Sequence, residues 1–388
     1  MRTYESTHPW LKFTLDLRRI DYEFWMSLGE AQSKCEHIAG VPLMEETAES
    51  LHRIYLAKGL LGTTAIEGNT LSEKEVQDRI EGKHDLPPSK EYLGQEIDNV
   101  VNTCNLIGDK LFESGSRDLC IEDIKNYNKM ILEKLPLEKE VIPGEIRTYP
   151  AGVGRYRAAP AEDCEYLLEK LCEWLNTGFS APKEANRMAF GILKAIVGHL
   201  YFTWIHPFGD GNGRTARMIE FQTLLISGIP SAAAHLLSNH YNETRKEYYI
   251  QLDESSKSPD GEFSFIKYAV RGFVDGLRDQ LEVVKKQQLN VTWEKHIHDV
   301  FKGKDRLSSR RRRHLILDLS NRKEPISKAS QIMEISPRIA SAYSKKTEKT
   351  IRRDIRELLK LGLIKPEESG IVPNKEKIRA FLPKIVKS

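Results

Sequence analysis

The spacing of hydrophobic and polar positions predicts that most of this chain is helical. Apolar residues recur every three or four positions from about Leu11 onward, which is the period of a helix with one buried face. Turn-forming residues interrupt the pattern at 40–42 (GVP) and at 86–89 (LPPS). We therefore expect a helical N-terminal region at 1–95.

One helix of this region ends at a recognisable stop signal. Residues 56–69, LAKGLLGTTAIEGN, are largely apolar and finish on Gly68-Asn69, a pair that favours a helix terminus. We expect the helix to end just past Glu67.

Helical patterning resumes beyond residue 90, with one exception. The further predicted helices are 91–135, 163–176, 184–205 and 214–226. Between them, residues 147–160, RTYPAGVGRYRAAP, combine β-favouring residues with glycines, which is typical of a short hairpin. So small a hairpin is marginal alone, and we expect it to pack on the helical body.

The most apolar stretch, 188–205 (MAFGILKAIVGHLYFTWI), is long enough to be considered as a membrane span. Lys194 and His199 lie in its middle, and a Lys at the centre of a bilayer is costly. A helix buried in a protein core is the better interpretation, so we expect no membrane partner. His199 is interpreted as a hydrogen-bonded core residue.

Charge divides the chain near residue 305. Residues 305–388 contain 22 Lys+Arg and 10 Asp+Glu, a net charge of +12. Subtracting these from the totals of 59 and 56 leaves 37 basic and 46 acidic residues in 1–304, a net charge of −9. This asymmetry indicates a basic module for an anionic partner, attached to an acidic body.

Cysteine usage and the first residues indicate a reducing compartment. The five cysteines are odd in number and lack paired spacing, which favours reduced thiols over a disulfide framework. The first residues, MRTYES, are not followed by an apolar core, so no secretory signal is predicted. We expect a cytoplasmic protein.

The strongest chemical signal is the run HPFGDGNGRTAR at 206–217. Pro207 prevents the preceding helix from continuing, and the glycines that follow predict a tight loop ahead of the helix 214–226. The amides at a helix N-terminus, where the dipole contributes about half a positive charge, form a site for an anion.

The charged residues of this run point to a polyphosphate. Arg214 and Arg217 share one face of the first helical turn, where positive charge opposes the dipole, so they need an anionic partner. A polyphosphate can satisfy the amides and both guanidinium groups. Asp210 beside bound phosphates supplies the carboxylate that Mg²⁺ prefers, and His206 is the general base of the loop at neutral pH.

Residues 206–217 resemble the Fic family signature HPFx(D/E)GNGRxxR at every fixed position. The resemblance implies a helical core with a β-hairpin flap, and transfer of AMP from ATP to a Tyr, Thr or Ser hydroxyl with release of pyrophosphate. It implies that His206 deprotonates the target hydroxyl and that Asp210 binds Mg²⁺. The other residues implied to bind the nucleotide are Gly211, Asn212 and Gly213 at the α- and β-phosphates, Arg214 at the γ-phosphate, and Thr215, Ala216 and Arg217.

The resemblance extends to the predicted hairpin and to a tyrosine downstream. Residues 147–160 lie where the family has its flap, which would align the target segment by strand addition. The implied nucleotide-facing residues of the flap are Val153, Gly154, Arg155 and Tyr156. Tyr249 resembles the tyrosine that lines the adenine pocket, although it could also pack in the core. Ser256 stands where some relatives have an adenine-contacting Asn, which leaves base selectivity open.

Residues 63–68, TTAIEG, resemble the inhibitory motif (S/T)xxxE(G/N) of the family. Thr63 and Glu67 are four residues apart, on one helical face. The resemblance implies that Glu67 pairs with the first arginine of the signature, Arg214, and obstructs the γ-phosphate. We expect an enzyme held inactive by its own N-terminal helix. An ordinary solvated Glu67, or a Glu67 that positions a water for removal of AMP, are the alternatives.

The basic tail resembles a winged helix-turn-helix. Helices are predicted at 308–321 and 347–361, and in the second of them Ile351, Ile355 and 358–359 face inward. The residues expected to face outward are Lys349, Arg352, Arg353 and Arg356. This pattern favours DNA binding, with a protein-interaction module or a solvated charged face as alternatives.

Together these patterns predict a mainly α protein, with a Fic-type helical core, a small β-hairpin flap and a C-terminal winged helix-turn-helix domain. The predicted division is a helical region at 1–95, a catalytic core at 96–285, a linker at 286–304 and a basic domain at 305–388. The expected function is that of a protein adenylyltransferase using ATP and Mg²⁺. The alternatives are a de-AMPylating hydrolase or a DNA-binding regulator with a nucleotide-sensing core. The intact signature favours an enzyme over a regulator, and it favours AMP transfer over transfer of phosphate or phosphocholine. Expected partners are a target protein, this chain included, with duplex DNA and a second copy as further candidates.

Overall fold

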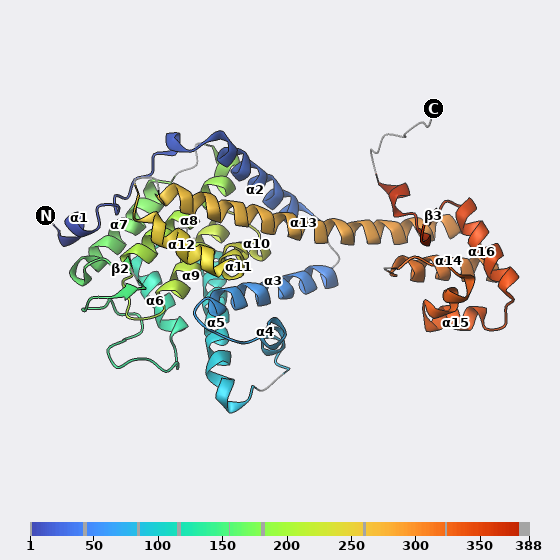
Figure 1. Ribbon diagram of the computed structural model, residues 1–388, viewed down its shortest axis with the longest axis horizontal. Coiled ribbons are helices and arrows are strands. Elements are labelled where there is room, and N and C mark those ends of the chain that lie inside the picture. The colour runs from blue at the N-terminus through green and yellow to red at the C-terminus, as the bar shows by residue number, and fades with distance from the viewer. Residues whose placement is uncertain are drawn as a thin grey trace. The chain divides into compact units, whose positions relative to one another are not determined.

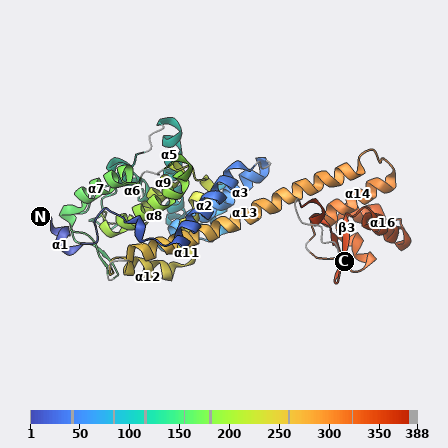
Figure 2. The same ribbon diagram turned by 90° about the horizontal axis from the view of Figure 1, so that it is seen from above.

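The computed structural model describes residues 2–41, 45–83, 86–114, 118–154, 156–179, 183–258, 261–322 and 324–379. The chain forms two compact units, residues 1–281 and 282–388. Both units are built mainly from helices, each with one small two-stranded sheet (Figures 1 and 2).

The first unit is almost entirely helical. Its α-helices are α1 (Thr3–Thr7), α2 (Tyr22–Gly40), α3 (Glu45–Ala65), α4 (Glu73–Ile80), α5 (Glu91–Ser114), α6 (Ile121–Ile131), α7 (Cys164–Thr177), α8 (Arg187–Ile205), α9 (Asn212–Ile226), α10 (Ser231–Ala234), α11 (Leu236–Glu243), α12 (Arg245–Ser255) and the first part of α13 (Gly261–Phe301). Its 3-10 turns are η1 (Leu17–Arg19), η2 (Pro88–Lys90), η3 (Ala161–Asp163) and η4 (Glu184–Asn186).

Helix α8 lies in the core of the first unit because it is apolar on every side. Fourteen of its nineteen residues are buried, as a helix without a polar face requires. Among the described residues it is the one helix long and apolar enough to cross a membrane, and 78% of that apolar stretch is buried inside the protein. The prediction of a core helix is confirmed. Helices α7, α9 and α2 pack against it.

The loop between α8 and α9 forms as the glycines and Pro207 predict. Helix α8 ends at Ile205, and His206 takes a left-handed conformation with φ 50° and ψ 60°. Gly211 is also left-handed, with φ 74°. The side chain of Asn212 closes the loop, because its Oδ1 accepts from the amide of Phe208 at 3.0 Å and its Nδ2 donates to the carbonyl of Phe208 at 2.7 Å.

The predicted hairpin is present and short. Strands β1 (Gly152–Val153) and β2 (Tyr156–Arg157) pair antiparallel, with Val153 opposite Tyr156. Gly154 has φ 57°, as a two-residue hairpin turn needs. The ring of His8 hydrogen-bonds to the carbonyl of Arg157 at 2.9 Å, so the N-terminal segment supports the hairpin.

The N-terminal region differs from our expectation in two respects. Helix α3 ends at Ala65, so Glu67 lies in the following turn, where its amide donates to the carbonyl of Thr64 at 3.0 Å. The region 1–95 is also not a unit of its own. Leu60 and Val76 are buried in the same hydrophobic core as α8, so no boundary falls near residue 95.

The second unit combines the last part of α13 with three helices and a hairpin. Its elements are α14 (Leu307–Ser320), η5 (Ala329–Glu334), α15 (Pro337–Tyr343), α16 (Glu348–Lys360), β3 (Ile364–Glu367), β4 (Gly370–Pro373) and η6 (Lys375–Ile378). Strands β3 and β4 pair antiparallel, and Ile371 of β4 also bridges to Ile326. The predicted linker 286–304 is largely helix α13, because Trp293, Ile297 and Phe301 pack into the core of this unit.

Helix α16 presents the two faces that its sequence predicts. Ile351 and Leu358 are buried, Ile355 and Leu359 are half-buried, and the outward residues Lys349, Arg352, Arg353 and Arg356 are exposed.

One acidic residue lies on the inner face of α16. Buried Asp354 accepts hydrogen bonds from Arg311 at 2.6 and 2.8 Å, from Arg312 at 2.7 Å and from the hydroxyl of Tyr343 at 3.1 Å. Two arginines of the run 310–313 therefore hold the unit together and are not available to an external anion.

We expect Asp354→Ala to lower the unfolding free energy of the second unit by about 3 kcal/mol, because it leaves two largely buried guanidinium groups without their anion. Arg352→Ala on the same helix breaks only an exposed pair with Glu348 and should cost under about 1 kcal/mol. Hydrogen exchange of α14 and α16 in the full chain measures both. Equal effects of the two substitutions would contradict a structural role for Asp354.

Candidate active site

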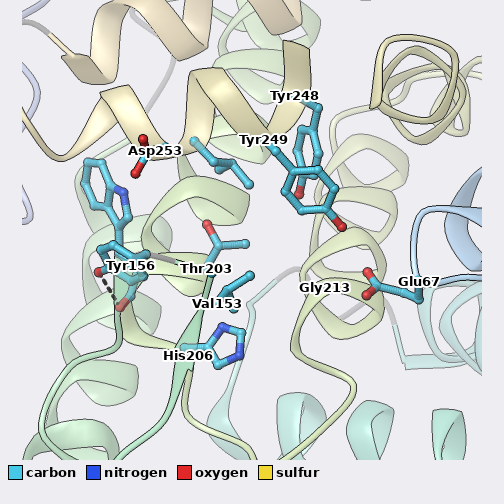
Figure 3. A pocket seen from close by; sticks show the side chains of 12 residues that line it. Glu67, Val153, Tyr156, Thr203, His206, Gly213, Tyr248, Tyr249 and Asp253 are labelled. Atoms are coloured by element: carbon cyan, nitrogen blue, oxygen red, sulfur yellow. Dashed lines mark hydrogen bonds between the residues drawn. The ribbon is translucent and has the colours of Figure 1, made fainter. Parts of the chain in front are cut away.

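The cavity of about 460 Å³ beside the loop brings together several segments of the first unit, including Gly213 at the N-terminus of α9. Its walls come from the turn after α3, the hairpin, the end of α8 with the loop, and helix α12. In Figure 3 the carboxylate of Glu67 lies beside Gly213, the ring of His206 lies near Val153, and Tyr249 lines the upper wall. The lining residues are Glu67, Val153, Gly154, Tyr156, Thr203, Trp204, His206, Gly213, Tyr248, Tyr249, Leu252 and Asp253.

Arg147 fixes the backbone that carries His206. Its guanidinium donates to the carbonyl of His206 at 2.8 Å, of Tyr149 at 2.7 Å and of Ala159 at 2.5 Å. Its amide donates to the carbonyl of Pro207 at 3.0 Å. The residue is only 4% exposed, so one buried arginine ties the base of the hairpin to the loop. Sequence reasoning placed no function on it.

The ring of His206 is kept neutral by its surroundings. Burial and the positive charge of Arg147 lower its pKa to about 4, against the opposing effects of Glu67, the Thr203 carbonyl and Asp210. A neutral imidazole has a free ring nitrogen that can accept a proton, although at a pKa of about 4 it is a weaker base than an ordinary histidine.

Glu67 occupies the space above the N-terminus of α9. A Cβ atom on Gly213 would overlap Oε1 of Glu67, so a larger residue there would displace the carboxylate from its present position. Burial raises the pKa of Glu67, but Arg217, with Arg214 and His206, lowers it below its ordinary value. An ionised carboxylate therefore lies where the helix dipole favours an anion.

Glu67 pairs with Arg217, and the expected pair with Arg214 is wrong. Nη2 of Arg217 donates to Oε1 of Glu67 and to the carbonyl of Thr63, at 2.5 and 2.9 Å. Helices α3 and α5 both pack on α9. The end of α3 therefore meets Arg217, whereas Arg214 one turn earlier pairs with Glu96 of α5.

Buried donors in this region lack partners among the described residues. Nε and Nη1 of Arg217 and Nε of Arg214 are buried without a hydrogen bond. Buried donors of this kind favour an additional anion as ligand. The arrangement therefore fits the phosphates that the sequence predicts.

Asp210 is the residue that could hold a divalent cation. Its carboxylate is 48% exposed, beside the N-terminus of α9, and one oxygen contacts the amide of Gly211 and Nη2 of Arg214. In the described part of the chain no group of three His, Cys, Asp or Glu side chains could hold a metal ion. One carboxylate is still sufficient for Mg²⁺ that arrives with phosphate oxygens and water.

The structure brings together some of the predicted site residues and buries others. Val153, Gly154, Tyr156 and Tyr249 line the cavity. By contrast, Thr215 and Ala216 are buried in α9, and the hydroxyl of Thr215 donates to the carbonyl of Gly211 at 2.8 Å. The side chains of Asn212, Thr215 and Ala216 thus shape the loop and the core. The amide of Thr215 donates to the carbonyl of Gly211 at 2.9 Å, so the amides free for an anion are those of the first helical positions, Asn212 and Gly213. Arg155 lies outside the described residues.

Sequence reasoning missed five lining residues. Four of them are predictable from helical neighbours: Thr203 and Trp204 lie within one turn of His206, and Leu252 and Asp253 follow Tyr249 by three and four positions. Ser256, the residue considered for base contact, is not among the lining residues, and Asp253 is. The fifth is Tyr248.

His199 is a core histidine, as expected. Its ring is fully buried, hydrogen-bonds to the hydroxyl of Tyr248 at 2.8 Å, and lies 3.2 Å from a carboxylate oxygen of Glu220. The hydroxyl of Tyr241 donates to the other oxygen of Glu220 at 2.8 Å. This network supports Tyr248 at the wall of the cavity.

Comparison with known proteins relates the site to one family. Residues 118–224 match the model of the Fic/DOC family. The chain is 26% identical over 234 residues to Protein adenylyltransferase fic-1 of Caenorhabditis elegans, which covers 60% of this chain and 42% of that protein. It is 28% identical over 278 residues to the Caenorhabditis briggsae protein of the same name, covering 70% and 50%. The chain spans half the length of these curated relatives or less.

Solved structures share the fold. A Fic family protein from Desulfovibrio desulfuricans G20 superimposes with a TM-score of 0.56 at 19% identity, over 90% of this chain and 93% of that one. Fic-1 from Caenorhabditis elegans superimposes with a TM-score of 0.53 at 22% identity, over 68% and 73%. The mainly α fold is therefore that of Fic proteins.

We expect the His206 ring to titrate at about pH 4 in the folded protein. The unfolded chain, whose histidine titrates near 6.5, then takes up the proton first as the pH falls. The stability contributed by neutral His206 is therefore complete above about pH 6.5 and is lost towards pH 4. NMR of histidine-labelled protein measures the pKa, and His206→Asn assigns the signal.

Glu67→Gln serves as the internal comparison, because it removes a carboxylate that raises the pKa of His206 and should lower that pKa further. A folded-state titration near 6.5 would rule out the buried neutral ring.

Proposed function

We propose that the chain is a Fic/DOC family enzyme that transfers AMP from ATP to a target protein, because residues 118–224 match the family model and the chain is similar to protein adenylyltransferases. The acceptor is a Tyr, Thr or Ser hydroxyl, and pyrophosphate is released. One observation carries the proposal: the imidazole of His206 lines the same cavity as Gly213 at the amide end of α9.

The transfer needs a proton acceptor and a fixed phosphate chain. The hydroxyl oxygen of the target forms a bond to the α-phosphorus, and the bond from that phosphorus to the oxygen bridging to the β-phosphate breaks. The proton of the hydroxyl passes to His206, and pyrophosphate leaves with the electron pair. The amides of α9 and the unpartnered donors of Arg214 and Arg217 would hold the phosphates.

The rest of the cavity suits the nucleotide base and a cation. The side chains of Tyr156, Trp204, Tyr248 and Tyr249 give the wall an aromatic surface, on which a purine can stack. Asp210 would hold Mg²⁺, which neutralises phosphate charge when it is bound with ATP.

We further propose that Glu67 inhibits the enzyme through Arg217. Its carboxylate lies above Gly213 and accepts a hydrogen bond from Nη2 of Arg217. It would therefore compete with phosphate for the amides and for the guanidinium. If the uninhibited arrangement is populated at roughly 1%, relief raises activity by at most about a hundredfold.

Removal of AMP by water is the second candidate function. Glu67 lines the cavity and its side chain is 30% exposed, which would let it hold a water molecule near a bound AMP-protein. The same site would then run hydrolysis instead of transfer.

We expect Glu67→Gly to raise AMP transfer with Mg²⁺ and ATP by up to about a hundredfold. Adding His206→Ala to that variant should abolish transfer, because the proton acceptor is gone. Intact-mass spectrometry reads the added AMP on the chain or on a target, and its loss from protein that was modified beforehand.

Glu133→Gly is the matched control, since it makes the same substitution in a turn after a helix, at an exposed residue paired with Lys134. Inhibition by Glu67 is disproved if the Glu67 and Glu133 variants behave alike. Transfer that persists without His206 would contradict the assignment of His206 as the proton acceptor.

We also propose that the second unit binds duplex DNA through α16. This helix and the segment before it expose basic side chains that make no ion pair among the described residues, namely Lys345, Lys346, Lys349, Arg353 and Arg356. The hairpin β3–β4 follows the helix, in the order of a winged helix-turn-helix. A basic helix face of this kind fits the phosphates that flank a groove.

We expect the full chain to retard a short DNA duplex at low salt, and Arg353→Ala with Arg356→Ala to weaken that binding about tenfold and to reduce the salt slope by about 2. Arg18→Ala with Lys170→Ala removes the same charge from the first unit and should have little effect. If the unaltered chain causes no retardation even at low salt, the DNA proposal is abandoned.

A further inference from the structure

Arg214 is held by a carboxylate outside the cavity lining. Its Nη1 donates to Oε1 of Glu96 on α5, and both side chains are largely buried, 8% and 10% exposed. Among the described residues Nε of Arg214 has no partner, and Nη2 makes only a 3.3 Å bond to the exposed Asp210. Glu96 therefore fixes Nη1, and the guanidinium keeps N–H groups on Nε and Nη2 for an incoming anion.

The second oxygen of Glu96 is fixed in turn by Asn69. Nδ2 of Asn69 donates to Oε2 of Glu96 at 2.8 Å and to the carbonyl of Leu93 at 3.0 Å. Oδ1 of Asn69 accepts from the amide of Leu71 at 3.0 Å. Every polar group of this buried amide is thus engaged, which leaves Glu96 a single orientation.

Asn69 and Glu67 belong to the same turn, residues 66–69. The amides of Glu67 and Asn69 both donate to the carbonyl of Thr64, at 3.0 and 3.2 Å. One side of the turn presents Glu67 to Arg217, and the other presents Asn69 to Glu96 and so to Arg214. The hydroxyl of Tyr249 also donates to the carbonyl of Ile66 at 3.4 Å.

We propose that Glu96 is a positioning residue for the terminal phosphate of ATP, acting through Arg214, and that Asn69 makes the 66–69 turn part of the ATP site. This inference rests on the proposed function. A planar guanidinium that is bound by Nη1 to a buried carboxylate still presents Nε and Nη2 as an edge for bidentate contact with phosphate.

The two carboxylates therefore act in opposite directions. Glu67 lies in the cavity where phosphate must bind, whereas Glu96 lies outside the lining and orients the arginine. Relief of inhibition then requires the partly exposed Glu67 side chain to move while the 66–69 turn stays in place. Displacement of the whole turn would release Asn69 and disorganise the phosphate site.

The test uses the full chain carrying Glu67→Gly, in which transfer is readily measured. Glu96→Gln keeps the shape of the side chain and removes its charge, and it should raise the KM for ATP about tenfold with little change in kcat. The affinity for α,β-methylene ATP should fall by the same factor, while the affinity for ADP, which lacks the terminal phosphate, stays unchanged. Asn69→Ala should act in the same direction.

Asp98→Asn is the matched control, because Asp98 lies on the same helix and pairs with a different arginine, Arg79, at 2.7 Å. Its KM for ATP should not change. Equal loss of ATP analogue and ADP binding, together with a lower Tm, would reduce Glu96 to a structural role and overturn the inference.

A second comparison is made in the chain that keeps Glu67. If Asn69→Ala or Glu96→Gln there raises transfer as Glu67→Gly does, both residues restrain the enzyme and the inference fails. It is also possible to separate the two proposals. If no variant transfers AMP but only the Glu96 and Asn69 variants lose binding of the ATP analogue, the result supports this inference and contradicts the proposed transferase function.

Discussion

The first unit depends on a guanidinium that has no access to solvent. Arg217 is 1% exposed and cannot lose its charge, so it needs an anion within the protein or from outside. Glu67 supplies that anion, which requires the turn after α3 to pack onto α9. An arriving polyphosphate must therefore compete for a charge that is already paired. In the proposed mechanism of inhibition, the ion pair that stabilises the first unit is also the one that restrains the site.

Local signals in the sequence predict the secondary structure well where local backbone conformation alone determines it. Pro207 and the glycines of the loop define the end of α8 and the start of α9, and the apolar pattern of α8 identifies a buried helix. The partner of Glu67 could not be read in this way, because Arg214 and Arg217 differ only in which neighbouring helix each one meets. Arg147 was missed because two of its carbonyl partners, on His206 and Ala159, lie 59 and 12 residues away and become neighbours only after folding.

The charges of the second unit show that composition alone does not predict what a basic residue does. A run of four arginines at 310–313 reads as an external binding surface, yet two of them pair with buried Asp354. An acidic residue between apolar neighbours on the inner face of α16 was the available signal for this. The exposed basic residues of α16 are a different set from the run 310–313, and they lie on the outward face of that helix. Net charge alone does not distinguish these two uses.

The absence of a side chain at Gly213 couples two positions that are 146 residues apart. With Glu67 present, even the methyl group of alanine would collide with the carboxylate. The two positions are therefore coupled: a larger residue at 213 requires the carboxylate of Glu67 to leave its place beside Arg217. A larger residue at 213 would thus weaken the pair between Glu67 and Arg217, and a shorter residue at 67 would leave room for it.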